Sequence, residues 1–297
     1  MRIRDMIPRT GQFFSLEFFP PKDRTKWPDF FKVVDTFRTL QPLFASVTYG
    51  AGGSTRDHTM EIVNRLKNEY EVEPMAHLTC VDADRAYIER FLDDLAGHNI
   101  DNVLALRGDA PKGREKAVAD DAEFRHAADL VSFIRGRHPD MGVGVAGYPE
   151  KHPEAASLDA DIGHLKAKLD QGGDFIITQM FFENRFYFDF VKRCRAAGIT
   201  VPIIPAILPI MNLAGLKRIL GLCGATIPGP FLRALEEADA SGGNAAVQRL
   251  GISHARFQIA DLLDREVPGV HLYTLNQVEA CMEIVQDLEL CKRLGAC

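Results

Sequence analysis

The chain has 297 residues, of which 46% are hydrophobic and 26% charged, enough to bury the core of one large α/β domain. A formal net charge of −6 argues against nucleic acid or an anionic membrane surface as the main partner. The amino terminus lacks the apolar stretch of a signal peptide, and no run of about 18 apolar residues offers a membrane span. The cysteines show no zinc spacing. We therefore expect a reduced, cytoplasmic protein.

The first predicted element is a short buried strand over residues 13–19, which is rich in phenylalanine. It ends at Pro20 and Pro21, because proline has no N–H to donate to a sheet. Glu17 therefore lies near the carboxyl end of a buried strand. A carboxylate in such surroundings either finds a cationic partner or has its pKa raised by desolvation, and in the second case it suits a general acid. A structural ion pair and a catalytic acid both remain open for Glu17.

The rest of the chain alternates between predicted strands and predicted helices. Further strands are expected over residues 44–49, 75–79, 102–106, 142–146, 175–179, 202–209 and 270–276. Apolar residues at helical spacing predict a helix after each strand. Ser54 or Thr55, and Asn184, are the expected caps of two of these helices. Residues 228–266 indicate additional helical material before the last strand.

About eight strand–helix units in succession predict a parallel sheet. The length is close to the roughly 250 residues of a (β/α)8 TIM barrel, so we predict that fold, with extra helices before the last strand. No linker rich in glycine, serine or proline divides the chain, and we expect a single domain over residues 1–297. An open, doubly wound sheet is the alternative, because spacing alone does not show closure.

Polar residues recur at the predicted carboxyl ends of the strands. In a barrel these ends converge on one rim, where active sites are built. Each residue also has a structural interpretation: Arg107 and Asp109 can pair with each other, His77 can be a core histidine, and the others can be satisfied internally. The set comprises Glu17, Thr48, His77, Arg107, Asp109, Tyr148, Gln179 and Asn276.

Two glycine motifs and the possible metal ligands are only weak evidence for a nucleotide, anion or metal site. Gly142, Gly144 and Gly147 match the letters of a dinucleotide fingerprint, but they lie within a predicted strand and no helix follows them, so they more plausibly leave room for a flat ligand. The segment 50–55 runs from strand to helix and suits either an anion or an ordinary turn. No metal is expected, since no ligand spacing is typical of a metal site.

Motifs along the whole chain together resemble the methylenetetrahydrofolate reductase family. They are Glu17-Phe-Phe-Pro-Pro, Val47-Thr-Tyr-Gly-Ala-Gly-Gly-Ser, His77-Leu-Thr-Cys, Leu106-Arg-Gly-Asp109, Tyr148-Pro-Glu-x-His152-Pro-Glu-Ala, Thr178-Gln-x-Phe-Phe182, Pro205-x-Ile-Leu-Pro209 and Tyr273-Thr-Leu-Asn276. The resemblance implies a (β/α)8 barrel that holds FAD and reduces 5,10-methylenetetrahydrofolate to 5-methyltetrahydrofolate with NADH or NADPH. It further implies the bacterial form, which consists of the catalytic barrel only, and a homo-oligomer.

The resemblance also implies roles for individual residues. Glu17 matches the acid that protonates N10 of the folate, and Asp109 matches a carboxylate near flavin and pterin that stabilises the cationic intermediate. Gln179 matches a residue that contacts the substrate, and Gln277 is assigned to the same site. The expected cofactor shell consists of Thr48, Tyr49, Ala51, His77, Arg107, Gly108, Asp109, Ala127, Tyr148, His152, Ala155, Asp161, His164 and Lys168.

Several positions depart from the family pattern. His164 and Ala167 stand where asparagine and arginine are usual, and His126 stands where tyrosine is usual. Gln277 replaces an arginine and Gly215 a glutamine. Two other classes of function therefore stay open, namely a flavin-free barrel lyase or aldolase, and a folate- or nucleotide-binding protein without turnover.

Overall fold

The structure is a computed structural model that describes residues 1–48, 56–81, 83–109 and 122–286. These residues form a nine-stranded sheet in the order β7-β6-β5-β4-β3-β2-β1-β9-β8, in which every pair is parallel. The strands are β1 (Phe13–Phe18), β2 (Phe44–Val47), β3 (Pro74–Thr79), β4 (Asn102–Leu106), β5 (Gly142–Gly147), β6 (Phe175–Thr178), β7 (Ile203–Ile204), β8 (Ala206–Ile207) and β9 (Gly269–Tyr273).

The sheet closes into a barrel through the two shortest strands. β7 and β8 are parts of one extended segment, separated by Pro205. β7 pairs with β6, and β8 pairs with β9, so the two ends of the sheet meet along this segment. The carbonyl of Pro205 accepts a hydrogen bond of 2.9 Å from the backbone N–H of His271, which continues the ladder across the interruption. The predicted TIM barrel is confirmed, and the open doubly wound sheet is wrong.

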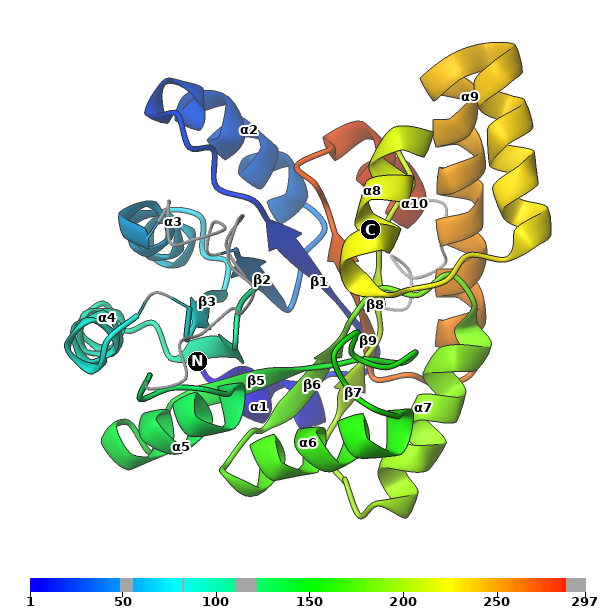
Figure 1. The fold of residues 1–297 in the computed structure, drawn as a ribbon. Coiled ribbons are helices and arrows are strands. Elements are labelled where there is room, and N and C mark those ends of the chain that lie inside the picture. The colour runs from blue at the N-terminus through cyan, green and yellow to red at the C-terminus, as the bar shows by residue number, and fades with distance from the viewer. Residues whose placement is uncertain (49–55, 82, 110–121, 287–297) are drawn as a thin grey trace.

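Helices surround this barrel (Figure 1). They are α1 (Ile3–Met6), α2 (Trp27–Arg38), α3 (Arg56–Asn68), α4 (Arg85–Gly97), α5 (Ala127–Arg137), α6 (Leu158–Asp170), α7 (Asn184–Ala196), α8 (Leu213–Cys223), α9 (Gly229–Asp264) and α10 (Val278–Gln286), with 3-10 turns η1 (Ile7–Arg9) and η2 (Arg24–Lys26). α9 is the extra helical material expected before the last strand. It consists of two arms that meet at Gly243, whose φ of 58° and ψ of −155° break the helix.

The residues of β1 show how the barrel interior is layered. All six are buried, and alternate residues face opposite sides of the sheet. Phe14, Leu16 and Phe18 join the large core between the sheet and the helices. On the other face Phe13 joins an apolar cluster with Ile3 of α1 at the amino end of the barrel, and Ser15 and Glu17 follow toward the carboxyl end. The inward face of β1 is therefore apolar at its amino end and polar at its carboxyl end.

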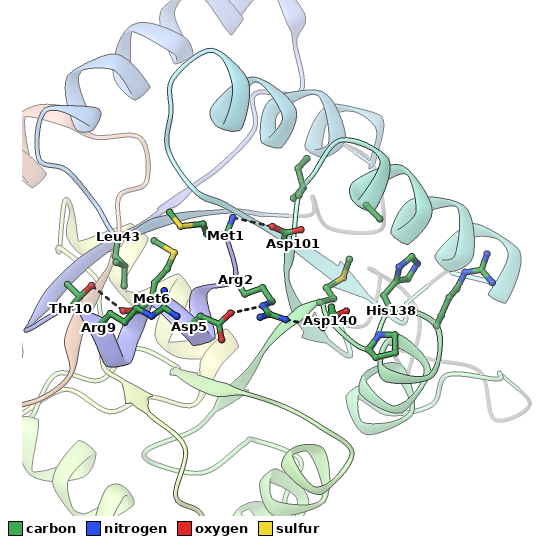
Figure 2. A pocket seen from close by; sticks show the side chains of 15 residues that line it. Met1, Arg2, Asp5, Met6, Arg9, Thr10, Leu43, Asp101, His138 and Asp140 are labelled. Atoms are coloured by element: carbon green, nitrogen blue, oxygen red, sulfur yellow. Dashed lines mark hydrogen bonds and ion pairs between the residues drawn. The ribbon is translucent and has the colours of Figure 1, made fainter.

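A cavity of about 720 Å³ lies outside the amino end of the barrel, beside α1. Its lining includes Leu43, Asp101 and Met141, which directly precede strands, so it is remote from the carboxyl ends. Its charged groups largely pair with one another: Arg2 contacts Asp5 and Asp140, and the amine of Met1 contacts Asp101 (Figure 2). This cavity is not the site that the strand-end residues predict.

Some local predictions differ from the structure. Asn184 is not a cap, because Glu183 occupies the cap position of α7 and the amide of Asn184 instead donates to the carbonyl of Gln258 and to Asp261. Ser54, Thr55, Tyr49 and Ala51 lie outside the described residues. Among the described helices, none is both long and apolar enough to cross a lipid bilayer.

Candidate active site

Glu17 is the centre of a buried polar cluster at the carboxyl end of the barrel interior. Its side chain is 7% exposed. Oε2 of Glu17 lies 3.4 Å from Nε2 of His77 on β3 and 3.8 Å from Nε2 of His271 on β9. The hydroxyl of Ser46 on β2 donates to the same oxygen at 3.5 Å. Three strands, β2, β3 and β9, thus direct polar side chains at the carboxylate carried by β1.

The backbone around Glu17 is held by the chain that follows β9. The N–H and the hydroxyl of Thr274 both donate to the carbonyl of Glu17, at 3.3 and 2.6 Å. The side chain of Asn276 accepts from the N–H of Phe19 at 3.1 Å and donates to its carbonyl at 2.7 Å. Asn276, a predicted strand-end residue, therefore fastens β9 to the end of β1, and this contact is structural.

His271 is fully buried behind Glu17. Its ring stacks on Phe44 with centroids 5.8 Å apart, and Nδ1 lies 2.8 Å from the hydroxyl of Ser15. When Ser15 donates to Nδ1, the ring proton sits on Nε2, which faces Glu17 and Ser46. Burial lowers the pKa of His271 despite the neighbouring carboxylate, so the ring tends to be neutral.

The pKa of Glu17 reflects two opposing effects. Burial raises it, but hydrogen bonding from His271 and His77 and the charge of these rings outweigh burial and bring the pKa to about 2. The sequence left a cationic partner and a raised pKa open; the structure supplies imidazole partners and a lowered pKa. At the same time, Nε2 of His77 is buried and, among the described residues, has no aligned hydrogen-bond partner, although it lies 3.4 Å from Glu17.

Two tyrosines lie close to this cluster. The hydroxyl of Tyr273 crosses the barrel and donates to the carbonyl of Thr178 at 3.1 Å. The ring of Tyr148 stands edge-on to the ring of His152, with centroids 4.7 Å apart. Burial raises the pKa of Tyr148 to about 12 and that of Tyr273 well above its usual value, so both hydroxyls are neutral donors.

Lys168 places an ammonium beneath the loop that follows β5. Its Nζ donates to the carbonyl of Ala146 at 2.5 Å. Burial lowers its pKa to about 8, with Asp161 acting weakly in the opposite direction. The carboxylate of Asp161 accepts from the backbone N–H of His152 at 2.9 Å rather than from Lys168. The ammonium is therefore a buried charge with incomplete compensation, a combination frequent at binding sites.

Arg107 does not pair with Asp109. Its guanidinium forms a bidentate ion pair with Glu154, with N–O distances of 2.5 and 2.8 Å, while Asp109 is exposed. Gly108 lies between them with a φ of 89°, and a Cβ there would approach a methyl group of Val81 to 2.8 Å, so this turn requires glycine. The pairing across the turn that the sequence offered as an alternative is wrong.

The remaining expected site residues are spread around the same rim. Thr48 follows β2, Gly108 follows β4, Ala127 begins α5 and Ala155 lies before α6. Gln179 follows β6, and its side-chain oxygen accepts from the N–H of Met180. His164 is exposed on α6 and Gln277 is exposed before α10. The structure brings Glu17 and His77 together and leaves Asp109, His164 and Gln277 at the surface.

The sequence reasoning missed His271, Ser15 and Ser46. A period-two pattern carried the signal, because Ser15 and Glu17 lie on the same face of β1, and His271 and Tyr273 on the same face of β9. Among the described residues, no group of three or more His, Cys, Asp or Glu side chains has the arrangement of a metal site.

The comparison with known proteins gives one family. The family model of methylenetetrahydrofolate reductase matches residues 2–289. The chain is 38% identical to methylenetetrahydrofolate reductase (NADH) 1 of Arabidopsis thaliana, over 97% of this chain and 50% of that protein. It is 36% identical to 5,10-methylenetetrahydrofolate reductase of Escherichia coli K12, over 92% of this chain and 90% of that protein. The chain thus spans about half the length of the plant relative and most of the bacterial one.

A solved structure supports the fold. An uncharacterised protein of Clostridium thermocellum that binds two copies of 5-methyl-5,6,7,8-tetrahydrofolic acid superposes with a TM-score of 0.66 over 95% of both chains. The sequence identity is 15%, so this likeness shows that the two chains share the barrel.

Proposed function

Since the chain belongs to the methylenetetrahydrofolate reductase family, we propose that it reduces 5,10-methylenetetrahydrofolate to 5-methyltetrahydrofolate, with bound FAD and with NADH or NADPH as the electron donor. The observation that carries the proposal is Glu17, a carboxyl group buried at the carboxyl end of the barrel among His77, His271 and Ser46. The conversion needs one proton donor inside a water-poor site, and this cluster provides one.

Two residues at the rim suit an anionic cofactor. Nε2 of His77 is buried and free of an aligned partner within the described part of the chain, so it is available to a ligand. The Lys168 ammonium, held by one carbonyl, suits a phosphate. Together these two groups support FAD rather than a flavin-free site.

The glycines of β5 do not contribute to such a site, and the interpretation that they leave room for a flat ligand is wrong. A Cβ at Gly144 would lie 2.8 Å from the ring of Phe175, and a Cβ at Gly147 would lie 2.8 Å from Ile176, so neighbouring side chains already fill this space.

The reaction divides into two transfers. A hydride is added to the methylene carbon of the folate, and a proton is added to N10 as the bond between that carbon and N10 breaks. FAD, when bound, carries the hydride from NAD(P)H to the folate. Glu17, once protonated, would deliver the proton to N10, and Asp109 at the rim offers a negative charge to the cationic folate.

A general acid must carry a proton, but the pKa of Glu17 is lowered. The ionised form is favoured while imidazole N–H groups face it. When the neighbouring rings are neutral and a ligand excludes water, burial acts on Glu17 without their charge and its pKa rises.

The two half-reactions test the assignment separately. Glu17→Gln should lower the rate of flavin oxidation by methylenetetrahydrofolate roughly 10²–10⁴-fold, because the acid is lost, and should leave flavin reduction by NADH or NADPH nearly unchanged. Glu73→Gln is the matched control: Glu73 is also buried but pairs with Lys67 at the amino end. Equal losses in both half-reactions of Glu17→Gln would contradict the role of Glu17.

The other two functions predict different behaviour of the purified protein. A lyase or aldolase would be colourless and bind no added FAD, and a binding protein would hold FAD yet leave methylenetetrahydrofolate unchanged. 2,3-Dimethylmalate lyase shares the barrel at 9% identity and a TM-score of 0.53. This likeness shows a common fold alone, so it does not favour lyase activity. Assembly into a homo-oligomer stays a prediction, and gel filtration with light scattering measures it.

A further inference from the structure

Lys151 makes an unusual set of contacts in the loop between β5 and α6. Its ammonium donates to the carbonyls of His152 at 3.0 Å, Pro153 at 3.2 Å and Ala155 at 2.6 Å. An ammonium has three N–H donors, so these three carbonyls use all of them. The side chain thus folds back over its own loop and fixes residues 152–155, whereas an ordinary surface lysine points into solvent.

The backbone at Lys151 is held in a conformation that favours glycine. Its φ is 100°, in the left-handed region that β-carbon-bearing residues rarely adopt. Such a conformation persists where the surrounding contacts determine it, and it is found often at binding sites. The three carbonyl contacts of the ammonium are the contacts that hold it here.

The loop is also fastened to three neighbouring elements. The N–H of His152 donates to Asp161 on α6, and Glu154 forms the bidentate ion pair with Arg107 beyond β4. The carboxylate of Glu150 accepts from the N–H of Thr226, between α8 and α9, at 3.1 Å. These contacts set where the loop lies on the rim, and Lys151 sets the internal shape of the loop.

We propose that Lys151 is a positioning residue of the cofactor site, and that its ammonium holds His152 and Ala155 in the arrangement that receives the cofactor. The inference rests on the proposed flavin function, in which both residues belong to the cofactor shell. Lys151 itself points its charge into the loop, so its effect on the cofactor passes through the loop backbone.

The test compares cofactor affinity with the mobility of the loop. Lys151→Met removes the ammonium and should raise the Kd for FAD about tenfold, with faster amide hydrogen exchange at residues 152–155 of the FAD-free protein and little change in its Tm. Lys151→Gly relieves the backbone strain but also removes the ammonium, so it should weaken FAD in the same way. Lys151→Arg retains a cation with several donors and should recover part of the affinity.

Lys166→Met on α6 is the matched control, since Lys166 pairs with Asp170 on the same helix, and this variant should match the wild type in all measurements. Wild-type affinity and wild-type exchange in Lys151→Met would overturn the inference. Wild-type affinity in Lys151→Gly alone would show that backbone strain governs the loop, and would overturn it as well. A wild-type protein that binds no FAD refutes the proposed function instead, and the exchange rates of residues 152–155 then still decide whether Lys151 holds the loop.

Discussion

Lys168→Met should stabilise the FAD-free protein while weakening the cofactor. The ammonium is buried at the end of β5, and among the described residues it donates to one carbonyl, that of Ala146. Burial lowers its pKa from 10.5 to about 8. Because each pH unit corresponds to about 1.4 kcal/mol, keeping this group charged in the folded protein costs about 3 kcal/mol at neutral pH.

Methionine has a similar length and no charge, so the substitution removes that cost. It also leaves the Ala146 carbonyl without its donor, which costs about 1–2 kcal/mol. The net gain expected for the free energy of unfolding is therefore about 1–2 kcal/mol at pH 7. The same change removes a cation for the cofactor phosphates, and charge-assisted hydrogen bonds of about 1.5–3 kcal/mol predict a Kd for FAD that is roughly 10–100-fold higher.

The stability difference between Lys168→Met and the wild type should depend on pH. Lys168 has a lower pKa folded than unfolded, so the unfolded chain binds more protons and wild-type stability rises as pH increases from about 8 toward 10.5. The advantage of Lys168→Met should therefore shrink to near zero at pH 9.5. Urea denaturation of FAD-free wild type and variant at pH 7 and 9.5 measures both values. A variant that is less stable than wild type at pH 7, or an advantage independent of pH, would refute the reasoning.

Three further predictions concern packing, a backbone clamp and acid stability. Gly251→Ala should lower the free energy of unfolding by about 3 kcal/mol in urea titrations, because the new methyl group would lie 2.1 Å from the carbonyl oxygen of Ile210. The control is Gly221→Ala on α8, which has open space around it and should be neutral or stabilising. Asn276→Ala should lower the Tm by several degrees, since the partly buried N–H and carbonyl of Phe19, directly after β1, lose their partners at about 1 kcal/mol each. The stability that ionised Glu17 contributes should be lost as pH falls from about 4.5 to 2, because its folded pKa is lowered, and Glu17→Gln should lack this loss in acid titrations of unfolding.

The sequence predicts the barrel well because strand and helix alternate with clear periods. The strand expected over residues 13–19 is β1, which ends at Phe18, so that Phe19 separates it from the two prolines. The strand expected over residues 202–209 is two short strands, since Pro205 interrupts the ladder between β7 and β8. Closure depends on this segment pairing on both sides, which is a tertiary fact that no local pattern contains. The kink at Gly243 is likewise a property of how the arms of α9 pack.

The candidate site was only partly predictable for the same reason. Strand-end position and burial identify Glu17 and His77 from local pattern alone. The contact between Ser15 and His271 joins residues 256 positions apart. A period-two pattern shows on which face of its strand each residue lies, but it does not show which other strand lies opposite that face. The partner of Arg107 was also hidden, because Glu154 lies in a loop whose path is set by Lys151 and Asp161.

The layering of the barrel interior explains why the polar groups gather at one end. Phe13 and the cluster around it, covered by α1, exclude water from the amino end. Along β1, the inward-pointing polar side chains Ser15 and Glu17 lie nearer the carboxyl end, where a ligand can contact Glu17. Nε2 of His77, which has no aligned hydrogen-bond partner in the part of the chain that the structure describes, and the buried ammonium of Lys168 both reduce stability in the absence of a ligand. A ligand that binds both groups recovers this free energy as binding affinity. The two groups that destabilise the ligand-free fold are therefore groups that the proposed function would use.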